Sequence, residues 1–171
     1  MTTQKQEINF HTFAVLVNNE PGVLSRVIGL FSGRGYNIES LTVARVDQRD
    51  NLSRITIVTS GTAQIIAQIR AQLDRLVPVH SVSDMTTDGP HVDRELALVK
   101  VEGEGEPRVE SLRIADIFRA RVVDSTNKSF VFEIVGRSRK LDAFIELMEP
   151  LGLVDVSRTG VAAISRGTGS L

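Results

Sequence analysis

The sequence predicts an α+β protein of two small sandwiches in tandem, each an antiparallel sheet with two helices on one face. Two observations lead to this fold class. Apolar, β-branched runs alternate with segments whose apolar residues recur at helical spacing. The resulting order, βαββαβ, fills about 75 residues and recurs after a polar stretch at 85–93. A chain of 171 residues is long enough for one domain or for two small ones.

The first half supplies all six elements of this order. Pro21 suits the first turn of a helix, where its missing N–H costs nothing, and the glycines at 33 and 35 suit the end of that helix. A polar turn at 47–51 separates two strands. The expected elements are a strand at 10–17, a helix with Leu24, Val27, Ile28 and Phe31 on its apolar face, strands at 38–46 and 52–60, a helix with Ile65, Ile66, Ile69, Leu73 and Leu76, and a strand at 77–83.

The second half repeats the order, and Ser138 is expected to cap its second helix. Its expected elements are a strand at 95–101, a helix at 109–120, a hairpin of 121–124 and 130–135, a helix with Leu141, Phe144, Ile145 and Met148, and strands at 154–157 and 161–164 that close the sheet. We therefore predict two ferredoxin-like domains, at 1–84 and 94–171, joined by a linker at 85–93. Sheets of this size leave edge strands and one face uncovered, so we expect oligomers.

Composition excludes several classes of protein. The formal net charge is -1, from 20 basic and 21 acidic residues, so a nucleic-acid binder is not expected. Cysteine is absent, which rules out thiol catalysis, disulfides and cysteine-ligated zinc. Neither a membrane-spanning run nor an N-terminal targeting segment is recognisable, so the expected location is the cytoplasm.

The search for catalytic and metal-binding residues is negative. His11, His80 and His91 have no helical pairing that would suit a metal ion. The glycine-rich loop at 103–106 carries two glutamates, which would repel a phosphate. We therefore predict no catalytic residue, no metal site and no cofactor in this chain.

Two segments, 19–27 and 34–41, stand above this background. The first places backbone N–H groups at a helix N-terminus, which suits a carboxylate, and Gly22 lets a ligand approach the backbone. The second places Asn37 at the start of a strand, where its amide can donate and accept. Together they suit a small amino acid, which offers one carboxylate and one ammonium group. The alternative is a capping Asn19, a turn glycine and a loop asparagine with no ligand.

The stretch NEPGVLSRVIGLFSGRGYNIESLTVA at 19–44 resembles the ACT domain that opens the small, regulatory subunits of acetolactate synthase (acetohydroxyacid synthase). Pro-Gly-x-Leu at 21–24 is shared by ACT domains in general, whereas RGYNIESL at 34–41 is more particular to these subunits. The second half agrees in RELALVKV at 94–101, FRARVVD at 118–124, KLDAF at 140–144, SRTG at 157–160 and SRG at 165–167. Ser138 and Arg139 depart from the small residues expected there, which bears on the helix cap.

The resemblance implies a non-catalytic partner of a large subunit that carries thiamine diphosphate, Mg²⁺ and usually FAD, and that serves branched-chain amino-acid synthesis. The small subunit would raise the activity of the large one and confer feedback inhibition, most often by valine. Two ACT domains would pair edge to edge as a homodimer, with the effector at their interface. Carried over by position, the effector contacts are Asn19, Gly22, Val23 and Leu24 of one chain and Asn37 and Ile38 of the other.

Two other classes of function stay open on the residues alone. An ACT-domain sensor that regulates another enzyme or transcription would need its own partner surface, such as a helix-turn-helix or a basic stripe for DNA. A stand-alone enzyme with this fold would need titratable groups that converge in a cleft. Neither feature is visible in the sequence.

Overall fold

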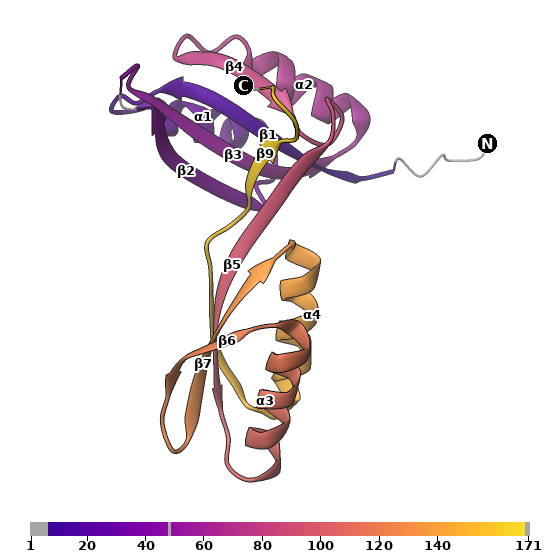
Figure 1. Ribbon diagram of the computed structural model, residues 1–171. Helices are drawn as coiled ribbons and strands as arrows, with labels where there is room; N and C mark the ends of the chain where they lie inside the picture. Colours follow the sequence, from indigo (N-terminus) through magenta and orange to yellow (C-terminus); the bar gives the residue numbers. More distant parts are fainter. Residues whose placement is uncertain (1–6, 48, 170–171) are drawn as a thin grey trace, which may run out of the picture. The chain divides into compact units, whose positions relative to one another are not determined.

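The computed structural model describes residues 7–47 and 49–169, which Figure 1 traces in chain order. Residues 1–6, where the sequence predicts no targeting segment, residue 48 of the expected turn and residues 170–171 of the second expected domain lie outside the described residues. Within the described ranges, no helix is long and apolar enough to cross a bilayer.

The chain forms two compact units, one of residues 1–92 with 161–171 and one of residues 93–160. This division differs from the expected ranges, because the last stretch of the chain belongs to the first unit. The reason is burial: Ala163 packs with Ala14 and Met85, and all three are buried. The expected linker is also ordered, since Met85 lies in that cluster and residues 91–92 already belong to strand β5 (His91–Glu102).

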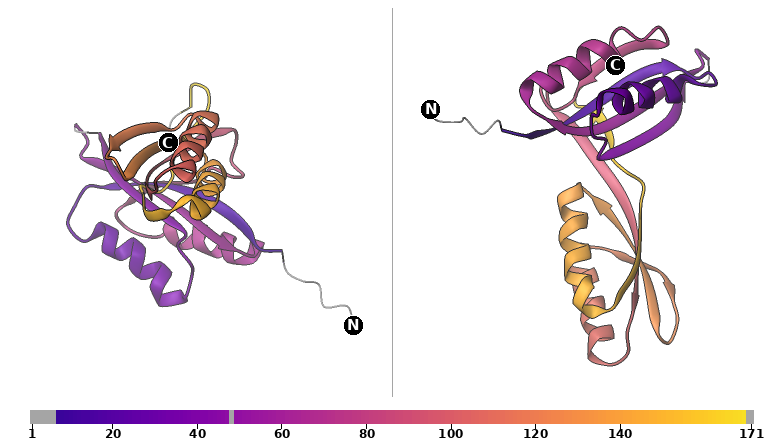
Figure 2. Two further views of the ribbon diagram at one scale, coloured as in Figure 1. Left: turned by 90° about the horizontal axis from the view of Figure 1, so that it is seen from below. Right: turned by 180° about the vertical axis from the view of Figure 1, so that it is seen from behind.

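The first unit is the expected ferredoxin-like sandwich. Its four antiparallel strands lie in the order β2-β3-β1-β4, and Figure 2 shows both helices on one face of the sheet. The elements are β1 (Asn9–Asn18), α1 (Val23–Arg34), β2 (Ser40–Asp47), β3 (Leu52–Gly61), α2 (Ala63–Leu73) and β4 (Val79–Asp84). Phe13, Val15 and Val17 alternate along β1 toward the helices and form the centre of the core.

The face that α1 turns to the sheet differs from the prediction. The structure buries Val23, Val27 and Phe31, whereas Leu24 is 37% exposed and Ile28 is half-buried. The buried residues are spaced at i, i+4 and i+8, which form one row along a helix. The helix ends as expected at Gly35, whose φ of 69° lets its N–H reach back to the carbonyls of the last turn.

The second unit repeats the same topology, with strand order β6-β7-β5-β8. Its remaining elements are α3 (Glu106–Phe118), β6 (Arg121–Ser125), β7 (Ser129–Gly136), α4 (Ser138–Met148), a 3₁₀ turn at Glu149–Leu151 and β8 (Leu153–Arg158). In its core, the ring of Phe132 contacts the rings of Phe130 and Phe144. The last strand, β9 (Ala162–Ser165), pairs with β5.

The prediction that Ser138 caps α4 is wrong. Arg137 occupies the capping position, with extended φ and ψ, and Ser138 is the first helical residue. The hydroxyl of Ser138 instead donates to Oε2 of Glu95 at 2.9 Å. A carboxylate brought by tertiary folding therefore competes successfully with the local helix end for this hydroxyl.

Candidate functional site

The N-terminus of α1 is an uncapped helix end. Gly22 holds the capping position, no side chain caps the helix in the described part of the chain, and the first turn has no acidic residue. The only charged side chains on α1 are Arg26 and Arg34. Because the N–H groups of a first turn have no intrahelical acceptor, this end carries a partial positive charge. It can therefore bind a carboxylate.

Gly22 gives access to this helix end. Its φ is 86°, in the left-handed region that favours glycine, and a Cβ built there would meet nothing within 4 Å. The space beside the residue is thus open. Any side chain at position 22 would project into it and would also strain the backbone.

Asn19 is held against the turn between β2 and β3. Its backbone N–H donates to the carbonyl of Asn51 at 2.8 Å, and Nδ2 of Asn51 donates back to the carbonyl of Asn19 at 3.1 Å. The two side chains meet as well, at 3.4 Å. Sequence reasoning missed Asn51. The available signal was an asparagine directly before an apolar strand, where its φ of 52° closes a turn.

Val23 and Leu24 differ in what they offer to a ligand. The side chain of Val23 is 5% exposed and belongs to the core, so only its backbone faces outward. Leu24 is 37% exposed and presents an apolar side chain next to the helix end. Of these two predicted contacts, Leu24 is therefore the one whose side chain can meet an aliphatic ligand.

Asn37 lies at the other end of α1, in a small polar cluster. Its Nδ2 donates to Oε1 of Glu39 at 2.5 Å, and the hydroxyl of Ser60 donates to the same oxygen at 2.9 Å. The buried Thr59 donates its hydroxyl to the carbonyl of Asn37 at 2.6 Å. Glu39 is a further residue that sequence reasoning missed, although its position two residues after Asn37 was a usable signal. Ile38, between them, is half-buried and packs against the core.

The six predicted residues do not come together within one chain. Gly22 precedes the first residue of α1, whereas Asn37 follows its last residue by three positions. A helix of this length spans about 18 Å, far more than a small amino acid can bridge. A ligand that touches both ends therefore requires two chains. That Asn37 and Ile38 come from a second chain stays a prediction.

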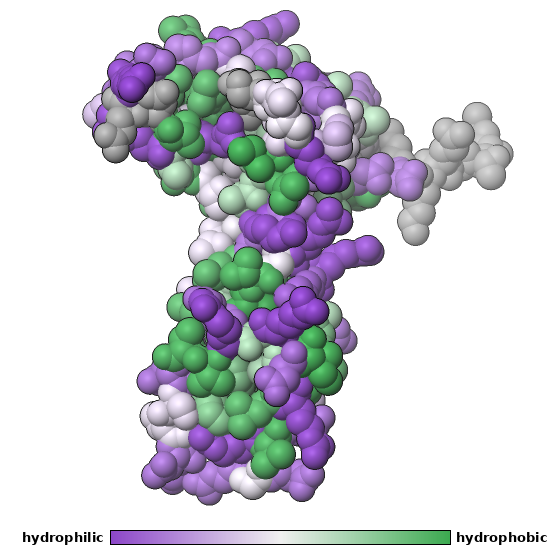
Figure 3. Space-filling view, in the orientation of Figure 1, coloured by the Kyte–Doolittle hydropathy of each residue, from purple (hydrophilic) through white to green (hydrophobic). Residues whose placement is uncertain are grey.

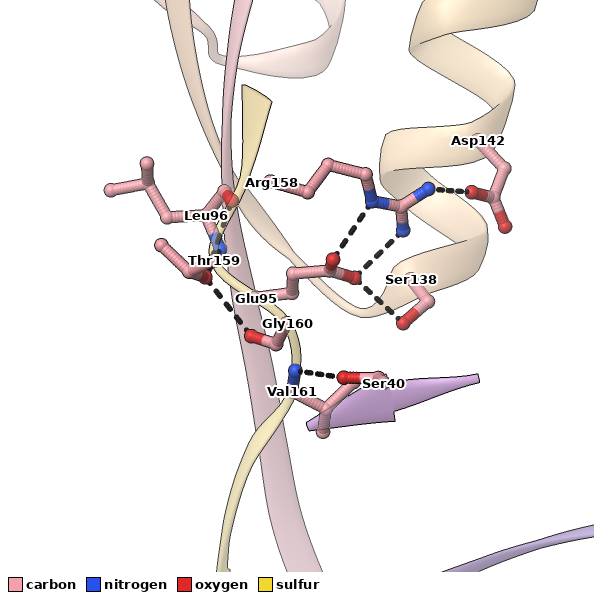
Figure 4. Close-up of polar contacts among 9 residues, drawn as sticks. All are labelled: Ser40, Glu95, Leu96, Ser138, Asp142, Arg158, Thr159, Gly160 and Val161. Atoms are coloured by element: carbon pink, nitrogen blue, oxygen red, sulfur yellow. Dashed lines mark hydrogen bonds and ion pairs between the residues drawn. The ribbon is translucent and has the colours of Figure 1, made fainter. Parts of the chain in front are cut away.

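The second unit contains a charged cluster that sequence reasoning missed (Figure 4). Arg158 donates through Nε and Nη2 to the carboxylate of Glu95, at 2.8 and 2.7 Å, and through Nη1 to Asp142 at 2.6 Å. Burial raises the pKa of Glu95, but hydrogen bonds from Arg158 and Ser138 outweigh it, so this pKa lies below its ordinary value. The bond to Glu95 raises the pKa of Arg158. Such a bidentate pair stabilises charge and leaves no group poised to accept or release a proton near neutral pH.

Binding of a metal ion would require a cluster of ligating side chains among the described residues. Within the described ranges, no group of three or more histidine, aspartate or glutamate side chains could hold a metal ion. Nδ1 of His11 instead lies 2.7 Å from Oδ2 of the buried Asp84.

Comparison with known proteins relates both halves of the chain to acetolactate synthase small subunits. A family model described as the AHAS small subunit-like ACT domain matches residues 13–81, and one described as the small subunit of acetolactate synthase matches residues 94–167. The small subunit of acetolactate synthase isozyme 3 from Escherichia coli is 48% identical over 155 residues, which cover 90% of this chain and 94% of the relative. The acetolactate synthase small subunit of Haemophilus influenzae is 47% identical over the same shares of the two chains.

A solved structure supports the fold over almost the whole length. The crystal structure of the acetolactate synthase small subunit from Thermotoga maritima matches with a TM-score of 0.82 at 34% identity, and covers 94% of this chain and 99% of that one. Two matching family models, close relatives over nine tenths of the chain and this structure all agree with the ACT-type topology described above. The chain belongs to the family of acetolactate synthase small subunits, which serve branched-chain amino-acid biosynthesis.

Proposed function

We propose that this chain is the non-catalytic, regulatory subunit of an acetolactate synthase complex. In this role it binds the large catalytic subunit, raises its activity and makes it sensitive to inhibition by a branched-chain amino acid, with valine as the effector. The observation that carries the proposal is the uncapped N-terminus of α1 behind Gly22, whose first turn has no acidic residue, so that an amino-acid carboxylate is stabilised there.

The groups at the other end of α1 suit the ammonium of the same ligand. Oδ1 of Asn37 can accept a hydrogen bond, and the carboxylate of Glu39 adds a negative charge beside it. Leu24 offers an apolar contact next to the carboxylate site, which favours an aliphatic side chain. Together these groups select a small, aliphatic amino acid.

Two copies of the chain complete the site. A twofold axis across α1 places the N-terminal end of one helix beside the C-terminal end of the other, so that Gly22 of one copy faces Asn37 of its partner. The strand β2 suits such a contact, because it lies at the edge of the sheet and leaves Val43 and Val46 44% and 51% exposed. The proposed homodimer therefore holds two equivalent effector sites.

Catalysis in the proposed complex belongs to the large subunit, for which we expect thiamine diphosphate, Mg²⁺ and FAD as cofactors. The small subunit shifts the equilibrium between the active and inhibited states of the large subunit. Couplings of this kind are typically about 1–3 kcal/mol, so the loss of one or two contacts to the effector is enough to remove inhibition at ordinary effector concentrations.

The test compares two substitutions at Gly22. Gly22→Asp places a carboxylate at the helix end, where it takes the stabilisation of about 0.3–1 kcal/mol that a negative charge gains and repels the effector. Gly22→Asn has the same shape and similar backbone strain without the charge. We measure acetolactate production by the reconstituted large subunit against valine, leucine and isoleucine. Inhibition is lost in Gly22→Asp and at most weakened in Gly22→Asn. A Gly22→Asp subunit that stays as inhibitable as the parent contradicts the site.

Asn37→Ala tests the other end of the site in the same assay. Removing one hydrogen-bond partner costs roughly 1–3 kcal/mol where the ligand group is left unpaired. Inhibition therefore shifts to higher valine concentration and is recovered when more valine is added, in contrast to Gly22→Asp. An unchanged half-inhibitory concentration removes Asn37 from the site.

A further inference from the structure

The segment 161–165 lies on the face of the first sheet that the helices leave open. Ala14 points away from the helices, because its neighbours Phe13 and Val15 on β1 point toward them. Ala14 is nevertheless fully buried, and it packs with Met85 and Ala163. Figure 1 shows β9 crossing in front of β1 and β3. A stretch from the end of the chain thus covers the centre of this face.

The backbone of Val161 is held by two hydroxyl groups of β2. Its N–H donates to Oγ of Ser40 at 2.8 Å, and its carbonyl accepts from Oγ1 of Thr42 at 2.9 Å (Figure 4 draws the first of these). Residues two apart on a strand point to the same side, so both hydroxyls reach the same segment. Val161 is 6% exposed, and its two backbone groups therefore depend on these partners. We call Ser40, Thr42 and Val161 the β2 clamp.

The β2 clamp acts on the strand that carries the proposed effector contacts. Ser40 and Thr42 follow Asn37 by three and five residues. The strand β2 is an edge strand, tied to β3 on one side, where the N–H of Glu39 donates to the carbonyl of Val58 at 2.8 Å. The clamp adds a second attachment, perpendicular to the sheet, directly after Asn37 and Ile38.

The clamp also links β2 to the end of β8 along the chain. Only Gly160 separates Val161 from Thr159, whose N–H donates to the carbonyl of Leu96 at 3.0 Å. The N–H of Leu96 donates in turn to the hydroxyl of Thr159 at 3.1 Å. One residue of backbone therefore lies between the attachment on β2 and an attachment on β5. The backbone of Gly160 is therefore the short covalent connection between these two attachments.

We propose that Ser40 and Thr42 are positioning residues for the effector response. Through Val161 they hold β2 in the position in which it binds the effector. Through the backbone of Gly160 they also transmit the binding of the effector to Thr159, directly after β8. This inference rests on the proposed function. The two residues touch Val161 and not the effector, so their role differs from that of the predicted contacts Gly22 and Asn37.

The test removes both hydroxyls while keeping the shape of the strand. The double variant Ser40→Ala/Thr42→Val leaves the N–H and carbonyl of Val161 buried without partners, so the segment detaches. In the reconstituted complex, we expect the valine concentration for half inhibition to rise at least fivefold, while the activation without valine stays at the parent level and shows that the subunit folds and binds. Thr42→Ser keeps the hydroxyl and retains the response of the parent.

Ser81→Ala is the matched control. Ser81 lies on β4, in register with Leu16 on the same open face, and its buried Oγ has no hydrogen-bond partner among the described residues. Its removal leaves inhibition unchanged. Amide exchange on the free small subunit supplies a second readout, in which the peptide around Val161 exchanges faster in the double variant and not in Ser81→Ala.

The outcomes separate the two proposals. A parent complex that valine, leucine and isoleucine all fail to inhibit overturns the proposed function, and the positioning role with it. A parent that is inhibited, with a double variant that is inhibited equally, overturns the positioning role alone. The same holds if Thr42→Ser loses the response as fully as the double variant, because the hydroxyl is then not what matters.

Discussion

The two units share one topology but differ at the helix that follows their first strand. Both α1 and α3 begin after a glycine with positive φ, 86° at Gly22 and 64° at Gly105, and neither start has a side-chain cap in the described part of the chain. Yet α3 carries Glu106 in its first turn, whereas the first turn of α1 has no acid. The two helix starts thus differ in charge: α3 supplies its own carboxylate, whereas the first turn of α1 leaves its N–H groups open to a ligand's carboxylate.

The open faces of the two sheets differ as well. In the first unit, residues 161–165 cover the centre of the face and bury Ala14. In the second unit, Leu98 and Val135 on the corresponding face are 40% and 46% exposed, and Figure 3 shows apolar side chains at the surface of this unit. On the face that the helices cover, the buried Glu95 pairs with Arg158, whose side chain is 32% exposed. Equal topology therefore leaves open how each sheet is completed, and this difference can be tested.

The largest expected effect comes from breaking the charged cluster of the second unit. Arg158→Met leaves Glu95, which is 6% exposed, as a buried carboxylate without its guanidinium. Removing one partner of a buried ion pair costs about 3–5 kcal/mol. Amide hydrogen exchange resolved by peptide should show faster exchange in β5 and β8, and parent-like exchange in β1 and β3.

Arg113→Met is the control for this experiment. Arg113 pairs with Glu110 at 3.3 Å on the exposed side of α3, and a pair of this kind contributes about 0–1 kcal/mol. Exchange in β5 and β8 should stay at the parent rate. Equal losses in the two variants would show that the Glu95–Arg158 pair does not hold the second unit together.

Acid should weaken the second unit before the first. The folded pKa of Glu95 is lowered, so its ion pair contributes stability above the unfolded pKa of about 4.3, and this contribution is lost as pH falls through the folded value. The first unit has a comparable carboxylate in Asp88, whose pKa is lowered by its bond to Arg70, but this side chain is 31% exposed and its contribution is screened by solvent.

Amide exchange between pH 5 and pH 3, corrected for the intrinsic dependence of exchange on pH, measures this difference. Protection in β5 and β8 should fall more steeply than protection in β1 and β3. In Glu95→Gln, which cannot titrate, the fall in the second unit should flatten. Parallel loss in both units of the parent would contradict the assignment to Glu95.

The smallest effect is expected at the start of α3. Glu106→Gln removes the acid that distinguishes this helix end from that of α1 and costs about 0.3–1 kcal/mol of stability in the second unit. Inhibition by valine should not change, because the proposed effector site is in the first unit. Urea unfolding measures the stability, and the acetolactate assay measures inhibition. Altered inhibition in this variant would contradict the claim that only the helix end of α1 takes part in effector binding.

The periodicity of the sequence predicted most of the helices and strands of the fold. Alternation of apolar residues located the strands, and the signals at the helix ends were local: Gly35 closes α1, and the side chain of Thr62 accepts the N–H of Ile65 at the start of α2. The errors also have local causes. The face of α1 was misjudged by one position because Leu24 and Val23 are both apolar. The strand β2 starts at Ser40, two positions after the expected start at 38.

The sequence by itself determined the order of the elements, the family and the residue types at the two ends of α1, because these depend on neighbours along the chain. Only the tertiary structure decided that Ser138 bonds to Glu95, that Arg158 pairs with it across 63 positions and that Val161 is held by Ser40 and Thr42. These contacts join residues far apart in sequence, and no local pattern encodes them. They form because buried charges and backbone groups must find partners, and folding decides which partners are within reach.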